Sequence, residues 1–236
     1  MLMSIIHLYG GERYRYMNIR ARTEEDKLQK KQMILRAARD LFFKHGYYGT
    51  TIEMITEKAG VSTGTFYLYY RNKIEIYKAL QDEGLDILIE MIDQVISWPG
   101  MSALAKLADI SRTYLRYFND YREYFDIMAV LSATPDELKE TETEISRIID
   151  GKTIELLKSI EKVIGEGIEN GELIEIDTWK ATSILWGMMD GLILLAERHN
   201  IENVIGVGLE ELVKQMLEIV FFGMVKDKGI THNSDY

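Results

Sequence analysis

Hydroxyl side chains are concentrated in the N-terminal third of the sequence, at positions where helices are expected to begin. Thr51 and Ser62 stand where a helix N-terminus leaves free backbone N–H groups, and a hydroxyl there can bind a phosphate oxygen together with those amides. Thr63 and Thr65 follow on the first turn of the next expected helix, and Gly64 between them lets the backbone approach a ligand closely. This pattern supports non-covalent binding of a polyanion.

Two phenols and a lysine continue the same pattern. Tyr67 and Tyr69 can each donate a hydrogen bond to a phosphate oxygen, and Lys73, at the start of a further expected helix, can pair with another phosphate. Packing inside a small domain is the alternative for Tyr67, and it applies less to Tyr69. The candidate contacts are therefore Thr51, Ser62, Thr63, Gly64, Thr65, Tyr67, Tyr69 and Lys73.

The charge distribution indicates which polyanion is bound. The 236-residue chain has a net charge of −10, yet residues 1–73 contain 13 Lys and Arg against 7 Asp and Glu, whereas residues 74–236 contain 15 against 31. A basic N-terminal part joined to an acidic body is typical of a nucleic-acid-binding head, and chance segregation of charge is the alternative. We therefore expect double-stranded DNA to be a partner.

The first helix that positions these residues is expected from Thr23 to His45. Thr23 supplies a hydroxyl cap before three acidic residues, which suit the positive end of the helix dipole. An apolar face follows at helical spacing, and a glycine ends the helix. Leu41 on this face, together with Ile55 and Phe66 from the next two helices, is expected to lie in the core of a small domain.

Two further helices follow closely. Thr50 and Glu53 form a capping-box pattern that predicts the start of the second helix, and Gly60 predicts its end. Ser62 predicts the cap of a third helix that extends to about Tyr70. Three helices with a tight, glycine-containing turn between the last two form a helix-turn-helix arrangement.

The segment from about residue 25 to residue 80 closely resembles the DNA-binding segment of tetracycline-repressor (TetR) family regulators. The matching residues are Gly46-Tyr47, Thr51-Ile52, Ile55, 59–67 and Asn72-Lys73. Two positions depart from the family pattern: Thr56 stands where alanine is usual, and Tyr70 where phenylalanine is usual. The rest of the chain resembles the family only in its length and its number of expected helices.

The resemblance implies a ligand-responsive transcription regulator, a repressor that binds a palindromic operator as a dimer and is released by a small effector. It assigns DNA contacts to the same hydroxyl, phenol and lysine positions, with the helix from Thr63 facing the major groove. That helix contains no Arg, Asn or Gln, the side chains that make two-pronged base contacts. We therefore expect specificity to come from several weak contacts and from the shape of the DNA.

The predicted fold class is all-α, with an N-terminal three-helix helix-turn-helix DNA-binding domain and a larger helical ligand-binding and dimerisation domain. We expect a flexible N-terminal extension over residues 1–22, the DNA-binding domain over residues 23–73, and the effector-binding and dimerisation domain over residues 74–236. Beyond the third helix, the expected helices cover residues 72–97, 102–120, 122–131, 134–171, 177–199 and 208–228.

The expected helices over residues 177–199 and 208–228 are apolar on more than one side. A helix of this kind needs two partners, and Gly187 and Gly191 would let a neighbouring helix approach closely. The family resemblance places a homodimer interface, a four-helix bundle, on these two helices. A wholly intramolecular core is the alternative.

Aromatic and methionine side chains are concentrated where the helices over residues 102–120 and 122–131 meet. Such a cluster is typical of a core, but in the family that the chain resembles the effector pocket lies among these middle helices, and methionine suits an adaptable apolar cavity. Asp190 stands inside an otherwise apolar helix and can hydrogen-bond either a neighbour or a ligand. The candidate effector-binding residues are Tyr114, Phe118, Phe125, Met128, Trp186 and Asp190.

The effector is expected to be a small, largely apolar or amphiphilic molecule between the middle helices. Few basic residues stand on their expected inner faces, so a deeply buried anionic head group would lack a cation partner. A neutral or cationic amphiphile fits better. An acyl thioester fits only if its charged part stays at the rim, near Arg112 or Arg116.

Several function classes lack their characteristic residues. There is no cysteine, and His7, His45, His199 and His232 stand far apart, so we expect neither a metal site nor a cofactor. No nucleophile–base pair or phosphate loop is recognisable, so we expect no enzyme activity. An all-helical enzyme, or a protein-interaction module without DNA binding, is the alternative.

The ends of the chain and its longest apolar run bear on location. The run over residues 183–196 is too short to span a bilayer, and the N-terminus lacks the features of a signal peptide, so we expect a cytoplasmic protein. Met17 is a second candidate for the translation start, because Gly10-Gly11-Glu12 has purine-rich codons typical of a translated ribosome-binding site. A true extension, in which Arg13 and Arg15 add phosphate contacts, is the alternative.

Overall fold

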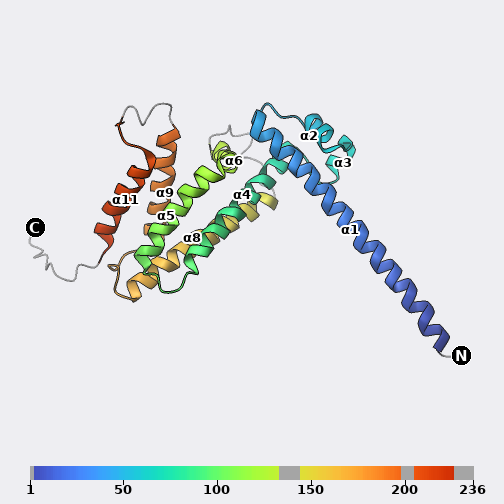
Figure 1. The fold of residues 1–236 in the computed structure, drawn as a ribbon, viewed down its shortest axis with the longest axis horizontal. Helices are drawn as coiled ribbons and strands as arrows, with labels where there is room; N and C mark the ends of the chain where they lie inside the picture. The colour runs from blue at the N-terminus through green and yellow to red at the C-terminus, as the bar shows by residue number, and fades with distance from the viewer. Residues whose placement is uncertain (1–2, 133–143, 198–204, 226–236) are drawn as a thin grey trace, which may run out of the picture. The chain divides into compact units, whose positions relative to one another are not determined.

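A computed structural model describes residues 3–132, 144–197 and 205–225, and helices make up nearly all of their regular structure (Figure 1). Within these residues the only other regular pairing is an isolated antiparallel bridge between Leu173 and Val225. The all-α prediction is therefore confirmed. None of the helices that the structure describes combines the length and the apolar character that crossing a membrane requires.

The chain divides into two compact units. The first contains α1 (Met3–His45), α2 (Ile52–Ala59), α3 (Thr63–Tyr67) and the beginning of α4 (Lys73–Ile96). The second contains the rest of α4 from Asp82, the helices α5 (Ala103–Asp120), α6 (Arg122–Ser132), α9 (Thr178–Glu197) and α11 (Leu209–Met224), and α8 (Glu144–Glu169) from Ser146 onward. The division falls inside α4, after residue 81, whereas the sequence predicted a domain boundary after residue 73. The assignment of separate roles to the predicted domains stays a prediction.

Helix α1 begins at Met3, so the predicted start at Thr23 is wrong. The segment before Thr23 contains no proline, and a threonine followed by acidic residues can be accommodated within a helix that has already formed. The other end agrees with the sequence: Lys44 and His45 occupy the last turn, and Gly46 has a positive φ of 69°.

The first unit has a small, closely packed core. Ile34, Ile55, Phe66 and Ile76 from four different helices are fully buried, which confirms the prediction for Ile55 and Phe66. Leu41 is only half-buried, so its assignment to the core alone is wrong. It lies one residue before the buried Phe42, where the apolar face of α1 turns toward solvent.

The N-cap of α2 is Thr51 and not Thr50, which corrects the predicted capping box. The Thr51 hydroxyl accepts a hydrogen bond from the Met54 N–H at 3.2 Å. Thr50 is fully buried, and its hydroxyl donates to the Gly46 carbonyl at 2.9 Å, which closes the end of α1. Hydrogen bonds from the backbone and from Thr51 lower the pKa of the Glu53 carboxyl.

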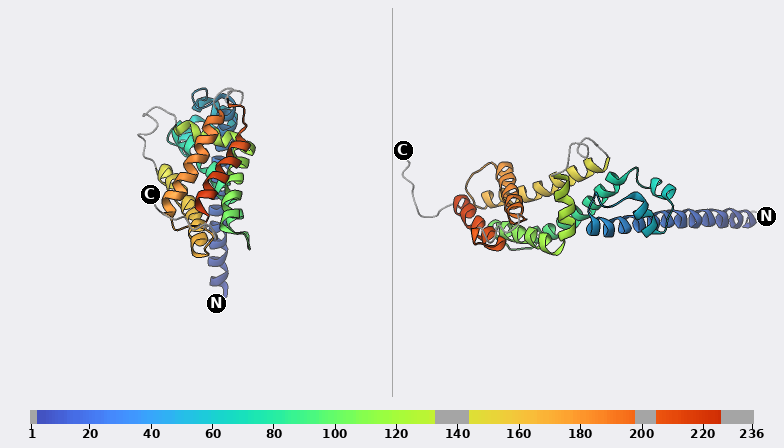
Figure 2. Two further views of the ribbon diagram at one scale, coloured as in Figure 1. Left: turned by 90° about the vertical axis from the view of Figure 1, so that its left-hand side faces the viewer. Right: turned by 90° about the horizontal axis from the view of Figure 1, so that it is seen from above.

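The second unit packs its helices around a core to which several of them contribute. Leu88, Tyr117, Ile164 and Ile193, from α4, α5, α8 and α9, are all fully buried. The predicted start of the helix leading into α8, at Thr134, lies outside the described residues. Helices α9 and α11 run side by side, and α11 also lies next to α5 (Figures 1 and 2).

Candidate nucleic-acid interface and effector sites

A short turn joins α2 to α3 and presents the N-terminus of α3 to solvent. Gly60 adopts a left-handed conformation with φ of 66°, and its N–H donates to the Glu57 carbonyl at 3.1 Å, which ends α2. Ser62 then caps α3: its hydroxyl accepts from the Thr65 N–H at 3.1 Å and lies 2.9 Å from the Thr65 hydroxyl. The turn and the cap are as the sequence predicts.

Most of the predicted contact residues at the N-termini of α2 and α3 are exposed to solvent. Thr51, Ser62, Thr63 and Gly64 are exposed, and Thr65 is half-buried. An added Cβ at Gly64 would meet only the Ser62 hydroxyl, at 3.8 Å, so this glycine leaves open space in front of the helix. The first turn of α3 thus offers backbone and hydroxyl groups to a ligand without a covering side chain.

Tyr67 and Tyr69 differ in their exposure to solvent. Tyr67 is 54% exposed, although its ring meets Phe66 edge-on at 5.5 Å. Tyr69 is half-buried, so packing in the domain affects Tyr69 more than Tyr67, the reverse of the weighting from the sequence. Helix α3 ends at Tyr67 and not near Tyr70. The N–H groups of Leu68 and Tyr69 donate to the carbonyls three residues before them, those of Thr65 at 3.2 Å and Phe66 at 2.9 Å, which is the spacing of a 3₁₀ turn.

Lys73 is bound within the first unit. Its ammonium donates to the carbonyls of Tyr47 and Thr50 at 2.8 and 2.9 Å, and it lies 4.2 Å from the centre of the Tyr47 ring. Partial burial lowers the pKa of Lys73, which starts from an ordinary value of 10.5. Two of its three N–H donors therefore hold the loop between α1 and α2 in place. Sequence reasoning missed this role, and the phosphate contact stays a prediction.

Three of the predicted effector residues meet in the second unit. The Tyr114 hydroxyl donates to the Asp190 carboxylate at 2.5 Å, and the Tyr114 and Trp186 rings lie 4.9 Å apart. Burial raises the pKa of the Asp190 carboxyl, while hydrogen bonds from Tyr114 and Trp186 lower it. The pKa of the Tyr114 phenol is also raised, mainly by burial. Asp190 thus hydrogen-bonds a neighbour, one of the two roles considered for it.

The other predicted effector residues form an adjoining aromatic cluster. Phe118 meets Phe125 edge-on at 5.0 Å, and Phe125 lies 6.2 Å from Tyr114. Met128 accepts a hydrogen bond through its sulfur from the Tyr117 hydroxyl at 3.4 Å. These contacts are the tight packing of a core.

A small cavity borders this core. Its volume is about 30 Å³, and Tyr114 and Trp186 line it together with Ser111, Thr182 and apolar residues of α4, α5, α8 and α9. Phe118, Phe125, Met128 and Asp190 do not line it. A space of this size suits a water molecule and is far below the roughly 300–1,000 Å³ of ligand pockets.

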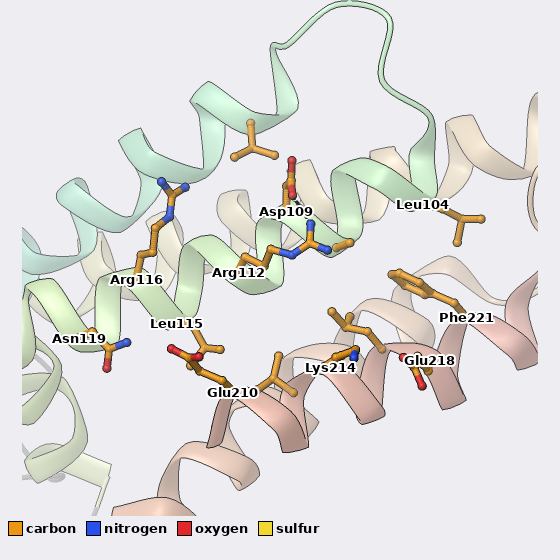
Figure 3. Close-up of a pocket in the computed structure, with 14 residues that line it drawn as sticks. Leu104, Asp109, Arg112, Leu115, Arg116, Asn119, Glu210, Lys214, Glu218 and Phe221 are labelled. Carbon is orange, nitrogen blue, oxygen red and sulfur yellow. Dashed lines mark hydrogen bonds and ion pairs between the residues drawn. The ribbon is translucent and has the colours of Figure 1, made fainter. Parts of the chain in front are cut away.

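A much larger groove lies between α5 and α11, with a volume of about 990 Å³ (Figure 3). Its apolar lining includes Leu104, Leu115, Leu217 and Phe221. Its charged and polar lining consists of Asp109, Arg112, Arg116, Asn119, Glu210, Lys214 and Glu218. Sequence reasoning placed only Arg112 and Arg116 at the rim of a site. For the expected helix over residues 208–228 the sequence predicts a dimer surface and a contact within its own domain, and it gives no sign of a groove beside α5.

Helices α9 and α11 also carry an exposed apolar surface. Ile184 on α9 is 60% exposed and Phe222 on α11 is 91% exposed. An added Cβ at Gly187 or Gly191 would meet no atom within 4 Å. Within the described residues, this surface has no partner helix of its own chain.

A capped helix-turn-helix unit and a larger helical unit define the class of DNA-binding regulators. The family model for bacterial regulatory proteins of the tetR family matches residues 34–80. The fatty acid metabolism regulator protein of Bacillus subtilis is 29% identical over 168 residues, which cover 70% of this chain and 82% of that protein. The regulator RutR of Escherichia coli K12 is 28% identical over 159 residues, covering 66% and 70%.

A solved structure is similar to this chain beyond residues 34–80, the segment that the family model matches. The regulator FadR from Bacillus subtilis, in complex with stearoyl-CoA, superposes with a TM-score of 0.62 at 25% identity, covering 81% of this chain and 98% of that one. Residues 34–80 thus match the DNA-binding segment of tetR-family bacterial regulatory proteins, and most of the chain is similar to TetR-family transcriptional regulators. The chain is a DNA-binding regulator of transcription, as the resemblance in its first 80 residues implied.

Proposed function

We propose that this regulator is a dimeric repressor that binds a palindromic operator and is released by an amphiphilic effector with a long apolar part. The observation that carries the DNA-binding half is the exposed first turn of α3, where Ser62 caps the helix and Gly64 leaves its front open. A regulator of chromosomal DNA acts in the cytoplasm, and repression of this kind requires no catalysis.

The proposed contacts to DNA come from the N-termini of α2 and α3, from α3 itself, from the residues between α3 and α4, and from the start of α4. Thr63 and Thr65 meet base edges in the major groove, whereas Thr51 and Ser62 hold phosphates at the N-termini of α2 and α3. Tyr67 and Tyr69 donate to further phosphates. Gly64 allows the backbone to approach closely. Lys73 contributes through the α1–α2 loop that it holds, and its third N–H donor remains for a phosphate.

A pair of conservative variants tests these contacts. Tyr67→Phe removes only a hydroxyl from an exposed side chain, and we expect it to weaken binding to operator DNA by about 1 kcal/mol. Tyr121→Phe is the matched control, because Tyr121 belongs to the second unit and its ring stacks on Tyr117. Fluorescence anisotropy with labelled operator DNA measures both. Equal losses in the two variants would contradict the assignment.

The effector proposal draws on the relatives and on the second unit. The similar FadR structure contains stearoyl-CoA, an amphiphile with a long acyl chain. Tyr114, Phe118, Phe125, Met128, Trp186 and Asp190 remain the candidate residues for the apolar part of an effector in this chain. Because the core cavity is only about 30 Å³, an effector there would have to move Trp186 or its neighbours apart. Binding would then favour one arrangement of the dimer over another.

Release is tested with the operator complex itself. Myristoyl-CoA, added below its micellar concentration, is expected to lower the anisotropy of labelled operator bound to the wild-type protein. Free coenzyme A is the control for the head group. If neither the thioester nor an uncharged analogue, monomyristoylglycerol, changes the anisotropy, the proposed effector class is wrong while DNA binding stands.

A further inference from the structure

The groove between α5 and α11 has two walls of different chemistry. Leu115 and Phe221 extend into the space between the helices, where they form an apolar lining with Leu104 and Leu217 (Figure 3). At about 990 Å³ the groove lies at the upper end of the range for small-molecule sites. An apolar surface of this kind can bind the hydrocarbon part of a ligand.

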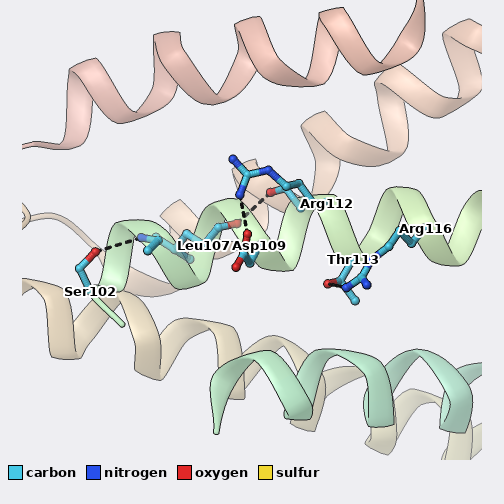
Figure 4. A network of polar contacts seen from close by, with 8 residues as sticks. Ser102, Leu107, Asp109, Arg112, Thr113 and Arg116 are labelled. Atoms are coloured by element: carbon cyan, nitrogen blue, oxygen red, sulfur yellow. Dashed lines mark hydrogen bonds and ion pairs between the residues drawn. The ribbon is translucent and has the colours of Figure 1, made fainter. Parts of the chain in front are cut away.

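The α5 wall carries an excess of positive charge. Arg112 and Arg116 stand one helical turn apart, and Arg112 pairs with Asp109 on the same wall (Figure 4). Arg116 donates to the Thr113 hydroxyl at 2.8 Å, and among the described residues no carboxylate lies within ion-pair distance of it. A guanidinium whose partner is neutral keeps its capacity to bind an anion through two parallel hydrogen bonds.

The α11 wall carries an excess of negative charge. Glu210 and Glu218 stand one turn before and one turn after Lys214, and within the described part of the chain none of the three forms an ion pair. An anionic group is therefore attracted to Arg116 and Arg112 rather than to α11. Both arginines are exposed, so a bound anion would stay partly hydrated and would not incur the cost of full burial.

The core cavity disfavours an anionic ligand group. It is about 30 Å³, and the neighbouring Asp190 carboxylate is held by Tyr114. A second anionic group beside that carboxylate would be repelled in a poorly solvated place. An amphiphile with an anionic head thus fits the groove better than the core.

We propose that the α5–α11 groove binds an anionic amphiphile. Its apolar chain lies along Leu115, Leu217 and Phe221, and its carboxylate or phosphate group is bound by Arg116 with Arg112. This inference rests on the proposed function and names the charge of its effector. It places the effector in the groove instead of among the core residues around Tyr114. Helix α4 contributes Val95 to the groove.

Isothermal titration calorimetry with a set of probes that differ in charge tests the site. The probes are myristate, myristoyl-CoA, uncharged monomyristoylglycerol and cationic tetradecyltrimethylammonium, each below its micellar concentration. Wild-type protein is expected to bind the two anions more tightly than the other two. Arg116→Gln is expected to weaken the anions about tenfold, and Arg112→Gln/Arg116→Gln further, while monomyristoylglycerol binding is unchanged.

Three variants distinguish binding in the groove from binding elsewhere on the protein. Phe221→Ser is expected to weaken all probes that have the hydrocarbon chain. Lys158→Gln removes an exposed cation of α8 outside the groove and is expected to change nothing. Trp186→Ala tests the core as the competing binding place. Circular dichroism and unliganded operator binding, measured on every variant, confirm that each is folded.

The results that would contradict the groove proposal differ from those that would contradict the proposed function. Equal binding of the anions to wild type and to the double arginine variant would overturn the groove proposal. So would loss of anion binding in Trp186→Ala alone, which would place the effector in the core and leave the proposed repressor intact. If unliganded protein fails to bind operator DNA, the proposed function fails, while the calorimetry still decides whether the groove binds anionic amphiphiles.

Discussion

At the scale of single residues, two polar groups that are candidate ligand contacts form hydrogen bonds inside the protein, a role that the sequence left open for Asp190 and did not indicate for Lys73. Lys73 donates to two loop carbonyls, and Asp190 accepts from Tyr114. Residue types alone could not distinguish these roles, since both lysine and aspartate can serve a ligand or a neighbour. The hydrogen-bond partners of Lys73 are backbone carbonyls more than twenty residues away in the chain. Because every residue has a carbonyl, residue types do not reveal which of them accept from Lys73.

Replacing Lys73 tests whether it holds the α1–α2 loop. Lys73→Met keeps most of the aliphatic chain but removes both hydrogen bonds, and we expect the free energy of unfolding to fall by about 1–2 kcal/mol. Lys44→Met, at an exposed position of α1, is the control for loss of charge. Chemical denaturation measures both. Unchanged stability with a salt slope of DNA binding lowered by about 1 would show that Lys73 is only a phosphate contact.

Asp190 makes the stability depend on pH. Burial raises its pKa from the ordinary value of 3.8, so the folded protein holds the proton more strongly than the unfolded chain. The resulting stabilisation is fully present below pH 3.8 and is lost as the pH rises through the folded-state pKa. Asp190→Asn, which keeps an acceptor for Tyr114, is expected to remove this decline. Melting temperatures of both proteins across the acidic range measure it, and parallel curves would refute the claim.

At the scale of helices, the ends that depend on local chemistry follow the sequence. Gly46 and Gly60 end α1 and α2 in left-handed conformations, and Ser62 caps α3. The helix ends that depend on competition between neighbouring residues do not follow the sequence prediction. Thr50 and Thr51 can both cap, and the choice falls to Thr51 because the Thr50 hydroxyl is engaged by the Gly46 carbonyl. Nothing in the sequence forces α1 to begin at Thr23, and the structure continues it back to Met3.

A series at Ser62 separates its cap from its proposed phosphate contact. Ser62→Ala removes the bond from the Thr65 N–H and is expected to cost about 1 kcal/mol of stability. Ser62→Asn and Ser62→Asp keep a capping oxygen, so their stability is expected to be close to wild type. The aspartate alone places a negative charge against the DNA and is expected to weaken operator binding strongly. Equal affinity of the asparagine and aspartate variants would mean that no phosphate lies near Ser62.

At the scale of the whole molecule, the second unit shows why the candidate effector site was only partly predictable. The aromatic residues near Tyr114 do come together, but they fill a core whose cavity is about 30 Å³. The larger groove is formed by α5 and α11, which are distant in the sequence, and periodicity within one helix does not reveal how two helices are spaced. The exposed face of α9 and α11 was foreseeable, because both segments are apolar on more than one side.

Dimerisation through that face is a prediction with a matched control. Phe222→Glu introduces a charge at a 91% exposed position of α11 and is expected to give monomers with weakened binding to the full operator. Ile154→Glu makes the same change at a 45% exposed position of α8, outside the proposed interface, and is expected to leave the dimer unchanged. Sedimentation velocity measures both. Two dimeric variants would place the interface elsewhere.

The most direct test of the central claim is selection of DNA from a random duplex library by the full-length protein, followed by sequencing. A dimer with one α3 in each major groove is expected to enrich an inverted repeat whose half-sites lie about one helical turn apart, roughly 34–36 Å. Enrichment of a single unrepeated motif, or of no motif at moderate salt, would contradict the proposal that this protein recognises a palindromic operator as a dimer.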